Sequence, residues 1–194
     1  MAPPTILTSQ VFNIGLMLFS MQVAKRIPWD DPQTVQLARA AYVLAQLAAI
    51  GISYYLMLVV KKKNDTTTLR YVKPAKPSTS GQPSEPEMMI TTNKAYDLDQ
   101  LQQAIRSTLT TALMFSVVHF YFKINQPLLI QSIVPIKNAL ISKEALIHIW
   151  GDAAEGPLKR PFKAESPFAA LLGMASAPLE ESNDTTSAAQ KKKE

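Results

Sequence analysis

The chain has 194 residues, a formal net charge of +5 and 18% charged residues, and its mean hydropathy is close to zero. It has no cysteine, which excludes disulfides and thiolate metal sites. It also lacks a Gly-rich phosphate loop, a nucleophile elbow and a metal-binding helix motif. We therefore expect no enzyme, no catalytic residue, no metal site and no cofactor.

The first apolar segment, Thr5 to Ala24, is long enough to span a bilayer, although it carries Gln10, Asn13 and Gln22. A secretory signal peptide is the alternative interpretation. However, no basic residue precedes the segment, and Lys25-Arg26 follows it where small cleavage-site residues belong. We therefore predict a retained membrane span.

The second apolar segment, Ala40 to Val60, is 21 residues long and contains no Lys, Arg, His, Asp or Glu. At about 1.5 Å per residue it covers roughly 30 Å, which is the thickness of the hydrocarbon core of a bilayer. A soluble protein would have to bury such a helix inside a large domain, and this chain is short. The segment therefore predicts a transmembrane helix.

Residues 61–95 form a polar stretch that begins KKKNDTTTLR and continues through the Pro/Ser-rich sequence KPAKPSTSGQPSEPE. The Pro/Ser-rich part has too little apolar surface to offset chain entropy, so we expect it to be disordered. Basic residues next to a span favour the cytosolic side. This rule places the stretch and the N-terminus in the cytosol and the loop after Lys25-Arg26 in the lumen. The basic residues concerned are Lys61, Lys62, Lys63, Arg70, Lys73 and Lys76.

Acidic residues precede two of the predicted helices. Asp30-Asp31 lies between prolines, which favours a turn and a helix cap over an acidic catalytic pair. Asp97 or Asp99 is predicted to cap a helix that runs through Leu101, Ile105 and Leu109 into the third apolar segment.

The third apolar segment, Ser107 to Phe122, has 16 residues. This is short for a span unless Ala104-Ile105 is included and Arg106 snorkels to the interface. His119 lies within the segment, and an ionisable residue in a membrane helix suggests a functional role. The alternative is a histidine that is hydrogen-bonded to a neighbouring helix.

A fourth, shorter segment, Leu128 to Ser142, follows a helix break at Asn125-Gln126-Pro127. Pro135 and Lys137 argue against a deep, lipid-facing span. We expect an interfacial, re-entrant or protein-covered amphipathic helix. Its predicted apolar face has helical spacing and consists of Leu129, Ile133, Ile136 and Leu140.

The C-terminal part, residues 151–194, is rich in proline and is predicted to be mostly extended or disordered. Within it, Lys159, Arg160 and Lys163 surround Phe162, a pattern that fits RNA phosphates or anionic lipid head groups as well as a solvated linker. Lys191 and Lys192 match a dilysine retrieval signal at a cytosolic C-terminus, and a solvated charge run is the alternative.

Together these segments predict an all-α multi-pass membrane protein. It has three hydrophobic segments, a fourth short membrane-associated or re-entrant helix, and a disordered cytosolic loop and tail. The expected divisions are 1–60 for the first two membrane segments and 61–95 for the cytosolic loop. They continue with 96–150 for the third segment and amphipathic helix, and 151–194 for the tail. If the third and fourth segments form a hairpin, the tail is cytosolic as well.

The predicted spans carry more amide and hydroxyl groups than lipid anchoring alone requires. In a bilayer such groups face protein or water. One hypothesis is a hydrophilic groove, open to the cytosol, that contacts client polypeptides through Gln22, Gln46, Ser116 and His119. The alternative is that these residues join the helices to each other or to a partner.

Several blocks in this order resemble a known family. NDTTTLRYVKP follows the second segment and YDLDQL precedes the third, and INQPLLIQSIVPIKNAL, IHIWG and GPLKRPFKA come after it. Over roughly residues 5 to 168 the chain resembles the fungal endoplasmic-reticulum membrane component of the SND (SRP-independent) targeting pathway. This family was historically labelled inorganic phosphate transport protein. The Pro/Ser-rich stretch and the residues after Phe168 are outside the resemblance.

The resemblance implies a multi-pass protein of the endoplasmic reticulum membrane that helps to deliver or insert nascent membrane proteins. The partners it implies are the Sec translocon, the ribosome, nascent membrane proteins, other SND pathway components and membrane lipids. Lys61, Lys62 and Lys63 and the tail cluster are the expected partner-binding residues. Phosphate transport is a rival function, but no internal repeat is visible and no arginine lies within a clear span. A purely structural subunit of a membrane complex is the third alternative.

The predicted orientation can be tested at two glycosylation acceptor patterns, Asn64-Asp65-Thr66 and Asn183-Asp184-Thr185. Both should stay unmodified if they face the cytosol, so endoglycosidase treatment should leave the electrophoretic mobility unchanged. Asn64 is the weaker reporter because it lies beside the membrane. A glycan on Asn183 would contradict both the hairpin and the retrieval signal.

Overall fold

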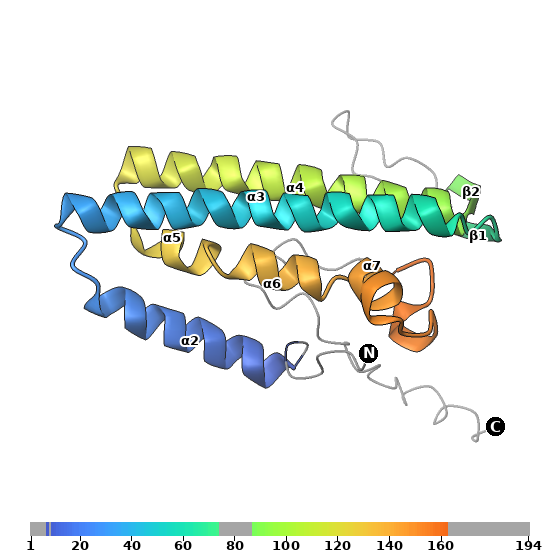
Figure 1. Cartoon of the computed structure of the whole chain (residues 1–194), viewed down its shortest axis with the longest axis horizontal. Helices are drawn as coiled ribbons and strands as arrows, with labels where there is room; N and C mark the ends of the chain where they lie inside the picture. Colours follow the sequence, from blue (N-terminus) through green and yellow to red (C-terminus); the bar gives the residue numbers. More distant parts are fainter. Residues whose placement is uncertain (1–6, 8, 74–86, 163–194) are drawn as a thin grey trace, which may run out of the picture.

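A computed structural model describes residues 7, 9–73 and 87–162 of the chain. Its two longest helices, α3 (Pro32–Lys63) and α4 (Asn93–Phe122), lie side by side and antiparallel (Figure 1). At about 1.5 Å per residue both exceed the roughly 30 Å of a bilayer core. α4 runs without a break from the polar YDLDQL sequence through the third apolar segment, as predicted.

The two long helices begin at different kinds of cap. Asp31 caps α3 as predicted, because its carboxylate accepts hydrogen bonds from the backbone N–H groups of Gln33 and Thr34 (3.3 and 3.0 Å). The Thr34 hydroxyl donates to the same carboxylate at 2.7 Å, and this bond, followed by the two backbone bonds, lowers the pKa of Asp31 below its usual value. At α4 the predicted cap at Asp97 or Asp99 was wrong. Thr92 caps this helix by accepting a hydrogen bond from the Ala95 N–H (3.2 Å).

A two-stranded ribbon connects α3 to α4, which corrects the all-α prediction. β1 (Thr68–Lys73) pairs antiparallel with β2 (Glu87–Thr92). One face of the ribbon, with Leu69 and Tyr71, is partly covered, whereas Val72 and Ile90 are exposed. Most of the stretch predicted to be disordered, residues 74–86, lies outside the described residues.

The chain then returns along α3 in two short helices instead of the single one predicted. α5 (Gln126–Gln131) begins at the predicted break, and α6 (Val134–Leu140) follows. Both contact α3, and α2 (Gln10–Arg26) packs against α5 (Figure 1). α2, α3, α4 and the α5–α6 pair therefore run alternately up and down the bundle.

The buried positions of the fourth segment lie outside its predicted apolar face. Ile133, which belongs to that face, is 40% exposed. A helix bundle in lipid can turn its apolar side chains outward and its polar ones inward. The buried positions are Leu128, Gln131, Val134, Lys137 and Ile141.

The last described part is a compact turn structure at the end of the bundle where α3 ends. It contains α7 (Lys143–Ala145), a π-helix η1 (Leu146–Trp150) and a 3-10 turn η2 (Gly156–Leu158). Gly151 terminates η1 in the left-handed region (φ 83°), which a residue with a Cβ adopts with difficulty. The chain therefore reverses towards α4 within residues 151–162, and the rest of the stretch expected to be mostly extended or disordered, residues 163–194, lies outside the described residues.

The exterior of the bundle is strongly apolar. Large apolar side chains on α3 are well exposed, including Leu44 (66%), Leu47 (60%) and Leu58 (48%). By length and composition, α3 is the one described helix that could cross a membrane by itself. Of the three hydrophobic segments expected from the sequence, the second lies in this helix, and the other two lie in α2 and α4.

The small apolar core predicts a clear stability difference between two leucines of α3. Leu56 is fully buried and packs with Val60, Leu101 and Ala145. Leu56→Ala should lower the free energy of unfolding by about 2–5 kcal/mol because it leaves a cavity. The exposed Leu58→Ala variant should change it by less than about 1 kcal/mol. Thermal unfolding in mild detergent measures both, and equal losses would contradict this assignment of the core.

Candidate functional site

Charged side chains meet at the end of the bundle where α3 ends and α4 begins. Asp97, in the second turn of α4, is 1% exposed. Its carboxylate accepts two hydrogen bonds from the Arg160 guanidinium, from Nε at 2.7 Å and from Nη2 at 2.6 Å. His148 Nε2 lies 2.7 Å from the same carboxylate. We call these three residues the Asp97 node.

The Asp97 node keeps its carboxylate charged despite burial. Burial raises the pKa of Asp97, but hydrogen bonds from His148 and Arg160 and the positive charge of Arg160 outweigh it and lower the pKa. Nearby, burial raises the pKa of Glu144, and the charge of Lys143 opposes this shift only in part. The pKa values of the two neighbouring carboxyl groups are therefore shifted in opposite directions.

Aromatic contacts also hold the segment around Phe162 against α4 and β1. The Tyr96 hydroxyl accepts a hydrogen bond from the Phe162 backbone N–H at 2.8 Å. The Tyr96 ring packs edge-on against the rings of Tyr71 and Phe162, with centroids 5.3 and 5.5 Å apart. The Lys143 ammonium lies 5.7 Å from the centre of the Phe162 ring. β1, α4 and the chain around Phe162 are thereby joined through one tyrosine.

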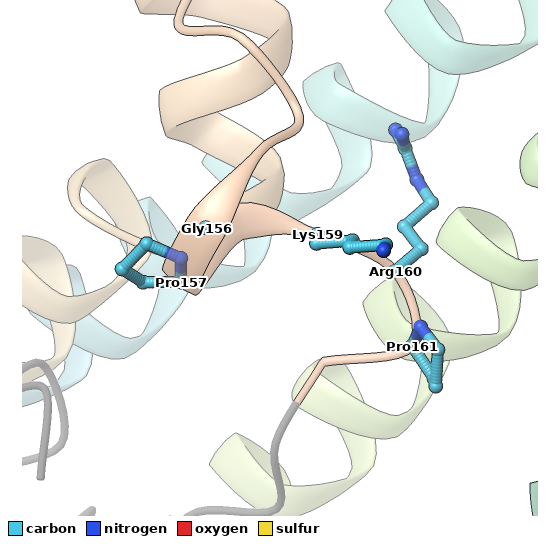
Figure 2. A pocket seen from close by; sticks show the side chains of 5 residues that line it. All are labelled: Gly156, Pro157, Lys159, Arg160 and Pro161. Carbon is cyan, nitrogen blue, oxygen red and sulfur yellow. The ribbon is translucent and has the colours of Figure 1, made fainter. Parts of the chain in front are cut away.

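The tail cluster predicted to bind partners is divided by this arrangement. Arg160 and Phe162 contact the chain itself, Lys159 is exposed, and Lys163 lies outside the described residues. Gly156, Pro157, Lys159, Arg160 and Pro161 line a small pocket, and Figure 2 shows the Arg160 side chain extending away from the turn. Partner binding by this cluster stays a prediction, with Lys159 as its available cation among the described residues.

Asp65 ties the end of α3 to the start of α4. Its carboxylate accepts hydrogen bonds from the Thr67 N–H (3.0 Å) and the Asn93 side-chain amide (2.9 Å). Hydrogen bonds from Thr67 and then Asn93 lower the pKa of Asp65 to about 2. The αL residue Asn64 ends α3 and accepts a hydrogen bond from Lys94 at 2.8 Å. The NDT sequence thus has a structural role as the junction of the helical hairpin.

The predicted basic run lies at this same end of the molecule. Lys61, Lys62 and Lys63 occupy the last turn of α3 and are exposed. Lys63 Nζ is 3.4 Å from the His148 carbonyl oxygen, which places η1 beside the end of α3. The structure therefore brings the run and Lys159 to one end, and their binding to partners stays a prediction.

The four predicted groove residues do not share one groove in the described structure. Gln22 is exposed on α2, whereas Gln46 donates a hydrogen bond across the bundle to the Gln131 carbonyl oxygen (3.2 Å). Ser116 donates back to its own helix at Ala112 (2.8 Å). His119 Nε2 accepts a hydrogen bond from Arg39 Nε on α3 at 2.8 Å.

A further polar contact was missed at the sequence level. Lys137 of α6 is 6% exposed and donates a hydrogen bond to the Asn13 side-chain oxygen of α2 at 2.6 Å. The available signal was a lysine in an otherwise apolar segment. The partner was not predictable because the two residues are 124 positions apart.

In the described residues, no group of three or more His, Asp or Glu side chains is placed to hold a metal ion.

Comparison with known families identifies the group to which these features belong. The family model described as Phosphate transport (Pho88) matches residues 7–194. The chain belongs to the Pho88 family. SRP-independent targeting protein 3 of Saccharomyces cerevisiae is 40% identical to it over 166 residues, which cover 84% of this chain and 85% of that protein.

A second Pho88 relative is more distant. The SRP-independent targeting protein 3 homolog of Schizosaccharomyces pombe is 32% identical over 164 residues, covering 84% of this chain and 82% of the relative. No solved structure matches the chain. The family resemblance predicted from the sequence blocks is thus confirmed. The predicted retrieval lysines, Lys191 and Lys192, lie outside the described residues.

The Asp97 node predicts a pH-dependent contribution to stability. At neutral pH, Asp97→Asn should lower the free energy of unfolding by about 3–5 kcal/mol, because it leaves the partly buried Arg160 unpaired. The folded-state pKa of Asp97 lies below the ordinary value of 3.8. The stabilisation is therefore fully present above about pH 4 and is lost as the pH falls through the folded-state pKa.

Thermal unfolding of the wild type and the variant at neutral and acidic pH checks this expectation. Asp99→Asn is the matched control, since Asp99 is exposed on the same helix. If the difference in unfolding free energy between the wild type and Asp97→Asn does not narrow in acid, the charge of the carboxylate does not contribute to stability.

Proposed function

We propose that this Pho88-family chain is a multi-pass protein of the endoplasmic reticulum membrane that takes part in SRP-independent targeting and insertion of membrane proteins. The observation that carries the proposal is the family membership together with relatives named SRP-independent targeting protein 3. The apolar exterior and polar interior of the helices support a site of action in the membrane.

The multi-pass arrangement is supported by the path of the chain. α2, α3, α4 and the α5–α6 pair run alternately, and α3 has the length and hydropathy of a span. Its neighbours bury polar groups against it, such as Gln131 and His119, while α3 and α4 turn large apolar residues outward. Such an arrangement is stable in hydrocarbon, where exposed polar groups are costly.

The basic end supports a cytosolic face that meets the ribosome and the Sec translocon. The exposed residues Lys61, Lys62 and Lys63 project from α3, and Lys159 lies at the same end. Clustered lysines attract RNA phosphates and anionic lipid head groups, an attraction that weakens as salt rises. In this orientation the Asp97 node also lies on the cytosolic side.

The interior contacts bear on how clients are handled. Gln46, Ser116 and His119 have partners inside the bundle, which favours helix packing over client contact for these residues. In the proposed role, clients contact the bundle from outside, and other SND pathway components and lipids surround it.

Phosphate transport is the alternative that the family description names. The specific feature in its favour is Lys137, a buried cation between α2 and α6. Its ammonium donates to Asn13, and no internal repeat is visible in the sequence, whereas inverted repeats are common in transporters. We therefore rank transport below targeting, and a structural subunit of a membrane complex is the third alternative.

The targeting proposal predicts direct contact with clients during their synthesis. Ribosomes stalled on a model membrane protein that carries a photo-reactive residue should crosslink it to this chain in microsomes from which SRP activity has been removed. Replacing Lys61, Lys62 and Lys63 with Glu should lower the adduct yield, because the ribosome is held less firmly.

Microsomes that lack the chain are the control for client insertion. Efficient client insertion without any adduct, or insertion that does not depend on the chain, would contradict the proposed function. Chain-dependent uptake of labelled phosphate by the same microsomes would favour transport.

A further inference from the structure

One face of α4 changes its chemistry halfway along the helix. Between residues 99 and 110 it is largely polar, with the exposed Leu109 (54%) at its edge, and from Leu113 through Val117 to Tyr121 it exposes large apolar side chains (68, 54 and 79%). The polar part, which we call the α4 outer stripe, is defined by five exposed residues: Asp99, Gln102, Gln103, Arg106 and Thr110.

The stripe lies on the side of α4 that points away from α3. At 100° per residue its five members fall within one sector of the helix. The buried residues Asp97, Leu101 and His119 fall in the opposite sector, against the rest of the bundle. The Thr110 hydroxyl donates a hydrogen bond to the Arg106 carbonyl oxygen (2.9 Å), and the Arg106 side chain remains exposed.

The depth of the stripe follows from how α3 and α4 pair. Arg39 contacts His119 near one end, and Asn64 contacts Lys94 at the other. In this antiparallel register, the residue numbers of facing positions add up to 158 at both contacts (39 + 119 and 64 + 94). Arg106 is therefore level with residue 52 of α3, and Gln103 is level with Tyr55.

That level lies within the apolar part of α3. The apolar run ends at Val60, eight residues beyond position 52, or on the order of 12 Å along the helix. Arg106 can snorkel over only part of this distance. Charged and amide side chains at such a depth are costly when they face lipid, and they normally face protein or water.

The apolar part of the same face is too short for a span. It extends from Leu113 to Phe122, which is about 15 Å, whereas a bilayer core is about 30 Å thick. α4 therefore meets hydrocarbon on this face along only half of its membrane length. Within the described residues, nothing covers the other half.

We propose that the α4 outer stripe is a docking surface for a transmembrane helix of a different protein. That helix carries an acidic residue at the depth of Arg106 and amide or hydroxyl side chains at the depth of Gln103. Polar residues of this kind join helices in membranes through interhelical hydrogen bonds and ion pairs. This docking does not depend on client handling, and we expect it also in complexes that hold no client.

Charge decides against a second copy of the chain as the occupant. Two copies inserted in one membrane have the same orientation, so a two-fold pair brings equivalent residues to the same depth. Arg106 would then face Arg106, and Asp99 would face Asp99. A different helix can place an acid against Arg106, so the pairing favours a heterologous partner.

Photo-crosslinking in native membranes tests the proposal. A photo-reactive residue replaces Gln103, and the matched control replaces Tyr55, which is level with it and 57% exposed on α3. The membranes are treated with puromycin and salt so that no nascent chains remain. We expect one discrete heterologous adduct from position 103, at least about tenfold stronger than from position 55.

Charge exchange then identifies the contact. Arg106→Glu should abolish the adduct, and replacing the acidic residue of the captured helix with Arg should restore it. Arg106→Gln covers the case in which Arg106→Glu does not fold, and it should lower the yield severalfold with unchanged thermal unfolding. A discrete adduct whose yield does not change with the charge at position 106 would overturn the proposal.

The other occupants give distinct results, and each of them overturns the proposal. A homodimer yields an adduct of twice the chain mass, and the parts of the chain outside the described residues yield a crosslink without a gain in mass. Lipid yields no protein adduct at either position. Clients yield heterogeneous adducts that disappear with puromycin, an outcome that would leave the proposed targeting function intact.

Discussion

Polar groups inside this bundle must find partners in the protein, because neither hydrocarbon nor a packed interior supplies water. Among the described residues, the chain meets this constraint with polar contacts between helices. Lys137 and Asn13 join α6 to α2, Gln46 joins α3 to α5, and Arg39 and His119 join α3 to α4. With apolar surfaces turned outward, these contacts specify which helices pack together and in which register.

The cytosolic end, as we propose it, is organised by charge. Asp65 fixes the junction of α3 and α4, and Asp97 holds Arg160 from the far end of the described chain. Hydrogen bonds from their partners lower the pKa of both carboxyl groups below the ordinary value. The exposed lysines at this end are left to interact with other molecules, while the acids serve the fold.

Sequence patterns predicted the elements that depend on local chemistry. The apolar run predicted α3, Asp31 predicted its cap, and Pro127 predicted the break before α5. The β-ribbon was missed because its strands pair across the long Pro/Ser-rich stretch, and pairing at that distance leaves no local signal. The partner of Arg160 is 63 positions away. The pattern of the fourth segment predicted its apolar face but not which face is buried, because that depends on whether water or lipid surrounds the bundle.

The lengths of α3 and α4 explain how these two regions are connected. With 32 and 30 residues, they cover about 48 and 45 Å, which is more than a bilayer core. The additional turns continue the same helices beyond the hydrocarbon and carry the basic run and Asp97 with them. Because no flexible joint separates the membrane part of either helix from the charged end, a partner bound at that end has a fixed position relative to the helices in the membrane. Such a rigid connection suits a protein that coordinates a cytosolic particle with an event in the bilayer.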